Sequence, residues 1–181
     1  NLKYRQIMKT MLPLRYQSVN WVDGMKICRE HFVAQENAQI DRFRDTILFN
    51  TGANGFGLLP PVNEHEPSFR LVLESGDLVL SHCRAITSGG LRVEVMPGFA
   101  EPLRLPVQDT LHRQNLENST GPLDVILMGD PWGRSTFGEM DLAETPPRQP
   151  FTQPSLRLEI VPPGQSKLTR QNGFVIKIGV L

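Results

Sequence analysis

The chain has 181 residues, of which 39% are hydrophobic, and this length allows one domain with a proper core but not two large ones. It carries 19 basic and 19 acidic side chains, scattered without a Lys- or Arg-rich run, so nucleic acid is not an expected partner. No apolar run reaches the ~20 residues of a membrane helix, and we expect no direct membrane insertion.

Residues 1–20 are predicted to be an N-terminal extension, followed by a single β-rich domain over residues 21–181. The extension is too apolar for a free tail, so we expect another protein chain to cover it or the domain's own sheet to pack against it. Its apolar side chains, interspersed with Lys and Arg, suit a partner interface. The candidate interface residues are Leu2, Tyr4, Ile7, Met8, Met11, Leu12, Leu14 and Tyr16.

A helix is predicted from about residue 28 or 29 to residue 49. Apolar residues recur there at helical spacing and predict one stripe along the helix, made of Val33, Ile40, Phe43 and Ile47. No Pro or Gly interrupts the segment. It is expected to end at residues 50–52, where Asn and Gly readily adopt the left-handed conformation that stops a helix.

The rest of the chain is predicted to be β. The predicted strands cover residues 56–60, 69–73, 78–86, 91–95, 103–107, 123–128, 156–161 and 174–181. If Ser75 and Gly76 form a two-residue hairpin loop, Leu73 faces Leu78 and Leu71 faces Leu80, with all four leucines on one face. Pro106 restricts residues 103–107 to a sheet edge.

Two segments receive no regular assignment. Residues 108–122 are polar, and the four prolines of residues 145–155 argue against regular structure. One helix followed by about eight short strands predicts a mainly β fold, either a β-sandwich or an open barrel.

No constellation for catalysis, for a cofactor or for a metal stands out. Cys28 and His31 have helical ligand spacing, but His82 and Cys83 are neighbours on a strand and point to opposite faces. There is no nucleophile motif, so we expect no enzyme activity. Two cysteines are few for a disulfide-stapled secreted domain, and we expect reduced thiols in the cytoplasm, with a bridge between Cys28 and Cys83 as the alternative.

The strongest local pattern lies at residues 21–36. Trp21 precedes a tight turn, and Phe32 lies near the start of the predicted helix. We expect the two rings to pack on each other and to anchor the helix on the sheet as core residues.

This pattern resembles the opening signature of the TssK family, the baseplate subunits of bacterial type VI secretion systems. The resemblance extends over residues 19–181, but its specificity is concentrated in residues 21–36, and Arg29-Glu30 departs from the family's usual Pro-Gln. The matching positions are Trp21, Asp23, Gly24, Met25, His31, Phe32, Gln35 and Glu36.

The resemblance implies a homotrimer whose N-terminal β-rich shoulder docks on the wedge subunits of the baseplate. A helical neck and a C-terminal head would follow the shoulder, and the head would contact the membrane complex. We therefore expect this chain to be the shoulder of a longer protein, in the cytoplasm at the inner face of the inner membrane. The family brings no catalytic residue and no cofactor.

Two other readings stay open. A phage-tail-like or carbohydrate-binding β-sandwich would use exposed aromatic side chains on loops, and Trp132 and Phe137 in the predicted loop of residues 131–137 are the candidates. A hydrolase on a β scaffold is disfavoured, because no nucleophile and base pair is found.

Overall fold

Strand β3 (Asp77–Ile86) is the centre of the first of two antiparallel sheets. The computed structural model describes residues 13–51, 55–162, 165 and 173–181. Every other strand of the first sheet pairs with β3, namely β1 (Gly57–Leu58), β2 (Phe69–Glu74), β4 (Arg92–Val95) and β5 (Leu103–Pro106). Since β2 and β5 both pair with the first half of β3, they lie on opposite sides of it.

The hairpin of β2 and β3 has the predicted register. Leu71 is opposite Leu80 and Leu73 is opposite Leu78. Ser75 and Gly76 have positive φ angles of 53° and 91°, as a tight two-residue hairpin loop requires. Of the four leucines predicted to share one face of this hairpin, Leu73 beside the turn is 64% exposed.

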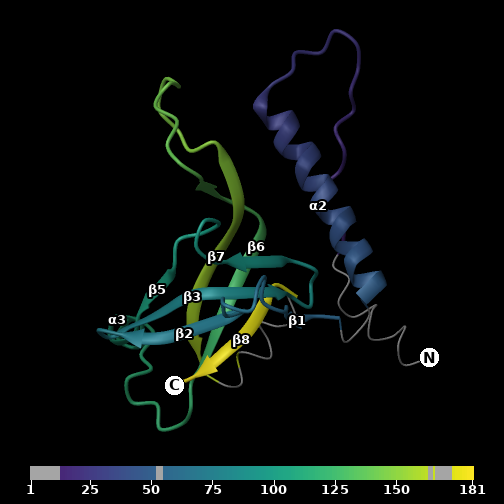
Figure 1. Cartoon of the computed structure of the whole chain (residues 1–181). Helices are drawn as coiled ribbons and strands as arrows, with labels where there is room; N and C mark the ends of the chain where they lie inside the picture. Colours follow the sequence, from purple (N-terminus) through teal and green to yellow (C-terminus); the bar gives the residue numbers. More distant parts are fainter. Residues whose placement is uncertain (1–12, 52–54, 163–164, 166–172) are drawn as a thin grey trace, which may run out of the picture.

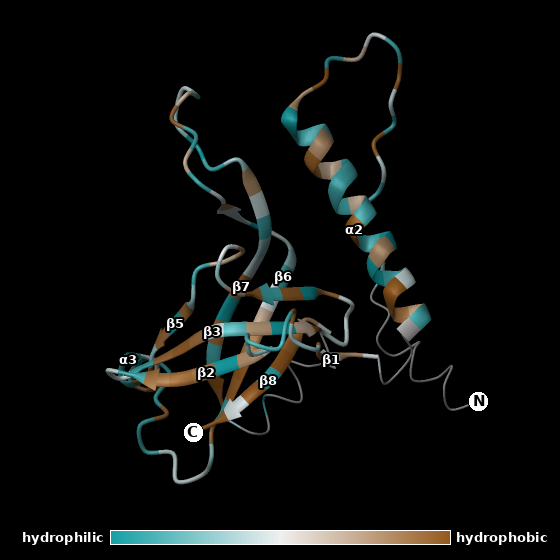
Figure 2. Cartoon of the chain, in the orientation of Figure 1, coloured by the Kyte–Doolittle hydropathy of each residue, from teal (hydrophilic) through white to brown (hydrophobic). Residues whose placement is uncertain are grey.

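The second sheet has three strands, with β6 (Asp124–Phe137) between β7 (Phe151–Val161) and β8 (Val175–Val180). Its apolar face packs against that of the first sheet (Figure 1, Figure 2). The main core cluster draws on both sheets and contains Leu80, Cys83, Ala85, Val93, Val95, Leu127 and Leu158. The described residues therefore form a β-sandwich-like fold of two sheets that are not closed into a barrel, which confirms the predicted class.

Both segments that received no regular assignment contain regular structure, and for residues 151–155 the expectation of irregular structure was wrong. A short helix, α3 (Val107–Arg113), occupies the start of the polar segment, where Thr110 is buried and its hydroxyl donates to the carbonyl of Pro106 at 2.6 Å. Residues 151–155 belong to β7 despite Pro154. The ladder with β6 is irregular next to Pro154, and a bulge is one of the few places where a sheet accepts proline.

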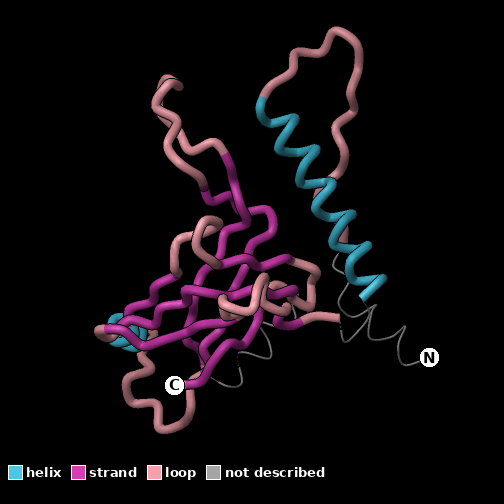
Figure 3. The backbone as a smooth tube through the Cα atoms, viewed as in Figure 1, coloured by secondary structure: helices cyan, strands magenta, loops and turns pink. Residues whose placement is uncertain are grey.

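The other helix, α2 (Arg29–Thr51), lies beside the two sheets and projects beyond them (Figure 1, Figure 3). The segment 13–28 runs along it and turns back into its first residue. We call residues 13–51 the arm. No described helix is both long and apolar enough to cross a membrane.

Candidate interaction surface

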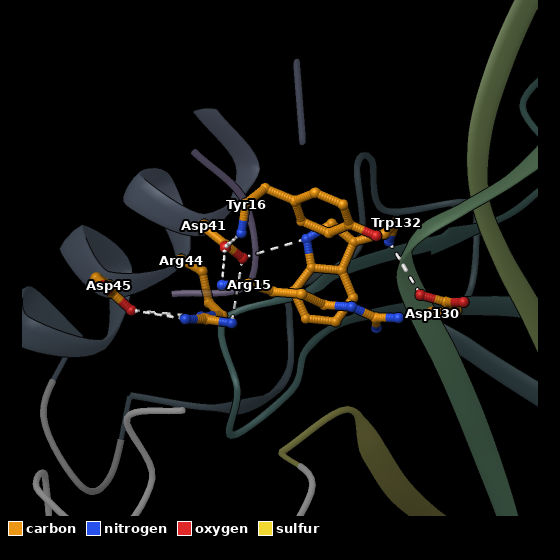
Figure 4. A network of polar contacts seen from close by, with 7 residues as sticks. All are labelled: Arg15, Tyr16, Asp41, Arg44, Asp45, Asp130 and Trp132. Carbon is orange, nitrogen blue, oxygen red and sulfur yellow. Dashed lines mark hydrogen bonds and ion pairs between the residues drawn. The ribbon is translucent and has the colours of Figure 1, made fainter. Parts of the chain in front are cut away.

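A bulge in β6 brings one aromatic side chain to the arm. In the ladder with β7, Asp130 of β6 pairs with Ser155 and Arg134 pairs with Pro154. The two partners are adjacent on β7, whereas residues 131–133 lie between Asp130 and Arg134 on β6. Residues 131–133 therefore bulge out of the strand. The carboxylate of Asp130 accepts a hydrogen bond from the backbone N–H of Trp132 at 3.0 Å, and the indole lies beside the arm (Figure 4).

Asp41 joins three segments of the chain at this point. Its Oδ2 accepts hydrogen bonds from the backbone N–H groups of Arg15 and Tyr16, at 2.6 Å and 2.9 Å. Its Oδ1 accepts one from the indole N–H of Trp132 at 3.2 Å and lies 3.4 Å from the guanidinium of Arg44 (Figure 4). Asp41 is 0% exposed, so these donors compensate for the water that its charge has lost.

Aromatic and cationic groups surround the indole. The guanidinium carbons of Arg15 and Arg44 lie 4.9 Å and 5.8 Å from the centroid of the Trp132 ring, within the range of cation–π attraction. Tyr16 lies at 5.9 Å, and Phe174 meets the indole edge-on at 5.5 Å. The arm is thus fixed to the sandwich by a joint of directional contacts. We call Arg15, Tyr16, Asp41, Arg44 and Trp132 the arm joint.

Further polar contacts continue the joint along α2. The guanidinium of Arg134 donates to Oδ1 of Asn37 at 2.8 Å and pairs with the carboxylate of Glu36 at 2.8 Å. On another side of the helix, the side-chain oxygen of Gln35 accepts a hydrogen bond from the backbone N–H of Val19 at 3.1 Å. Gln35, one of the residues that carry the family resemblance, therefore helps to hold the N-terminal segment on the helix.

Polar residues occupy the most buried side of α2, and the predicted apolar stripe lies beside this side. The buried helix residues are Asn37, Ala38, Asp41, Arg44 and Leu48, and three of these five carry polar or charged side chains. Within the predicted stripe, Val33, Ile40 and Ile47 are half-buried and Phe43 is 66% exposed. Phe43 is therefore the one member of the predicted stripe that is largely exposed.

The anchor role predicted for Trp21 and Phe32 is also wrong. The two rings do pack on each other, with centroids 6.1 Å apart, and His31 lies 6.0 Å from Trp21. However, Trp21 is 45% exposed and Phe32 is 61% exposed. They form an aromatic cluster at the outer end of the arm, because the helix begins away from the sheets (Figure 1).

The other residues of the signature shape this outer end. Gly24 has a φ of 77° in the predicted turn, which the backbone N–H of Met25 closes by donating to the carbonyl of Val22 at 3.3 Å. Asp23 is exposed and Met25 is half-buried. The signature thus builds a turn and an exposed aromatic cluster, and not a piece of the sandwich core.

The N-terminal extension is described from residue 13 onward, and this part lies along α2 and not on a sheet. Tyr16 belongs to the arm joint, whereas Leu14 is 51% exposed. The other candidate interface residues lie outside the described residues, namely Leu2, Tyr4, Ile7, Met8, Met11 and Leu12.

The two cysteines are free and occupy different environments. The sulfur of Cys28 lies 3.3 Å from Nδ1 of His31 near the start of α2. Cys83 is buried in the sandwich core, where burial, together with the nearby charge of Glu94, raises the pKa of its thiol to about 11. No cluster of three or more His, Cys, Asp or Glu that could hold a metal ion occurs among the described residues.

The two aromatic side chains considered for sugar binding make contacts within the protein. The predicted loop of residues 131–137 is part of β6, and Trp132 is enclosed in the arm joint. Phe137 packs on Phe151 of β7, with ring centroids 6.0 Å apart. A flat exposed indole for stacking on a sugar ring is therefore not offered by this segment.

Sequence reasoning missed the arm joint altogether. Asp41 and Arg44 are spaced three residues apart, which on a helix surface is typical of a solvated ion pair. The available signal was Pro131-Trp132-Gly133 between strand-like residues, a composition that favours a bulge. Nothing in the pattern indicates that this indole meets that carboxylate across 91 residues of sequence.

Comparisons with protein-family models, with curated proteins and with solved structures found no match to this chain.

Proposed function

We propose that this chain is a structural docking domain, the shoulder of a TssK-like baseplate subunit, and not an enzyme. Its partners would be the wedge subunits of a type VI secretion baseplate and two further copies of its own chain. The membrane complex would be contacted by the C-terminal region of the longer protein, at the cytoplasmic face of the inner membrane. No cofactor is part of this proposal.

The observation that carries the proposal is the set of exposed apolar side chains on the arm. Phe32 and Phe43 are eleven residues apart, about three helical turns, so both lie on one side of α2, ~16 Å apart along its axis. Trp21, Val22 and Ile27 are exposed at the outer end. We call these five residues the outer arm face. An apolar surface with charged neighbours such as Glu36 is typical of a protein–protein interface.

The arm joint supports the same proposal. Burial of apolar area is non-directional, whereas the hydrogen bonds of Asp41 and Arg134 fix the orientation of α2. A helix held by polar contacts keeps its aromatic side chains available for another surface. A rigid presentation also lowers the entropy cost of binding.

The proposal is tested by copurification of the full-length protein with its wedge subunits. We expect the double substitution Phe32→Ser and Phe43→Ser to reduce wedge binding strongly while the circular dichroism spectrum and unfolding midpoint stay unchanged. Leu73→Ser is the matched control, because Leu73 is equally exposed but lies on the sandwich. Unchanged wedge binding by the Phe variant would overturn the assignment of the outer arm face.

The oligomeric state is a separate test of the family assignment. We expect light scattering on the full-length protein to report three chains. A strict monomer at all concentrations would contradict the assignment, whichever surface binds the wedge.

A further inference from the structure

A groove of about 660 Å³ lies between the β4–β5 connection and the outer half of the β6–β7 hairpin. Its apolar lining includes Val95, Leu103 and Leu156, which belong to or pack against the main core cluster. The contacting rings of Phe137 and Phe151 form part of one wall. The groove is separate from the outer arm face, since none of its lining residues belongs to the arm.

Two strand edges border this groove. Among the described strands, β5 pairs with β3 alone, and β7 pairs with β6 alone. Each of them is thus an edge strand whose outer backbone groups are not part of a ladder. An extended peptide can add to such an edge by main-chain hydrogen bonds while its alternate side chains enter an adjacent pocket.

The charged residues in the groove are all acidic. Glu101 and Glu139 line it, and no Lys, Arg or His is found among its described lining residues. Neither carboxylate takes part in the ion pairs identified among the described residues. Arg148, in the same hairpin, is held by Glu144 through hydrogen bonds of 2.6 Å and 2.7 Å, which lower the pKa of Glu144.

We infer that this groove binds an extended segment of a partner protein, whose apolar side chains enter the groove and whose flanking Lys or Arg residues meet Glu101 and Glu139. The apolar floor supplies affinity, and the two carboxylates select for basic neighbours. The acidic lining disfavours phosphate-bearing ligands such as nucleic acid. This inference stands on the groove and does not depend on the proposed baseplate function.

The test selects peptides from a random phage-displayed library on the full chain and measures the dissociation constants of the selected peptides by fluorescence polarisation. We expect the selected sequences to be extended and rich in aromatic or aliphatic residues flanked by Lys or Arg. Backbone amides of residues 103–105, 151–153 and 155–156 should become protected from hydrogen exchange when a selected peptide binds.

The double charge reversal Glu101→Lys and Glu139→Lys should weaken these peptides by ~10-fold or more, equivalent to about 1.4 kcal/mol. Glu64→Lys with Glu66→Lys is the matched control, because it changes the net charge equally on an exposed loop away from the groove. Ala100→Trp, which fills the groove without changing charge, should abolish binding.

Three results would overturn the inference. The first is a selection that yields no binding peptide, and the second is a set of selected peptides without basic residues. The third is an equal loss of binding in the groove variant and its charge control, which would show a general charge effect.

Discussion

The sandwich and the arm are held together by opposite kinds of contact. The sandwich core is made of aliphatic side chains from both sheets, such as Leu80, Val93 and Leu127. The arm is fixed to it through the polar contacts of Asp41 and the indole of Trp132. Aliphatic burial supplies most of the free energy of folding but tolerates small shifts, whereas a hydrogen-bonded joint specifies one orientation.

The polar character of the contact between arm and sandwich explains why apolar side chains of the arm stay exposed. A helix that packed on the sheets through an apolar stripe would bury its phenylalanines. Since α2 uses polar residues for this contact, Phe43 remains 66% exposed. Buried ion pairs contribute little net stability, although removing one partner is costly. We therefore expect stability to depend mainly on the sandwich, and the position of the outer arm face to depend on the joint.

The largest effect is expected in the sandwich core. Leu80→Ala removes a side chain that is 0% exposed, and it should lower the free energy of unfolding by about 3–5 kcal/mol because of lost burial and the cavity left behind. Urea denaturation measures this change. Leu73→Ala, in the same hairpin but largely exposed, is the control and should cost far less; equal losses would place the hydrophobic core elsewhere.

The second effect concerns the joint. Asp41→Asn keeps the shape of the side chain but turns one acceptor into a donor that faces other donors, so we expect a local loss of about 2–3 kcal/mol. Hydrogen exchange should accelerate within α2 but not within β3. The control is Asp45→Asn, since Asp45 is partly exposed and contacts Arg44 but not Trp132. Uniform acceleration across both elements would show that arm and sandwich unfold together.

The sandwich and the arm also differ in how well they could be predicted from the sequence. The strands were predictable because alternating apolar residues and turn residues act locally, as in the hairpin with Ser75 and Gly76. The short helix α3 was not predictable from its polar sequence. It is stabilised by tertiary contacts, because Thr110 is buried and Leu111 packs against the sandwich.

Helix α2 was predicted with both limits correct to within two residues, but its orientation on the sandwich was not predicted. The period of Val33, Ile40, Phe43 and Ile47 identifies an apolar side of the helix, and the usual inference is that this side faces the core. That inference fails because Asp41 can be buried at low cost when it meets the Trp132 indole and two backbone N–H groups. Such partners are distant in sequence and leave no periodic signal.

The third effect is a dependence of sandwich stability on alkaline pH. The pKa of Cys83 is raised to about 11, so an unfolded chain releases this proton from about pH 9 while the folded chain retains it. Stability from this group is complete below pH 9 and is lost as the pH rises through 11, by up to about 3 kcal/mol over the window. Cys83→Val should lack this component. An identical pH profile in both proteins would contradict the role of Cys83.

The smallest effect on stability, and the sharpest contrast between the two regions, is expected at Trp21. The sequence pattern predicts a core anchor, and truncation of a large buried aromatic costs about 3–5 kcal/mol. The indole is instead 45% exposed and contacts Phe32 and His31 at the outer end of the arm. We therefore expect Trp21→Ala to lower the free energy of unfolding by less than ~1 kcal/mol, while weakening the binding of wedge subunits. Trp132→Ala is the matched aromatic control, because it should release α2 and accelerate its hydrogen exchange. A loss of several kcal/mol in Trp21→Ala would restore the anchor role and would remove Trp21 from the outer arm face.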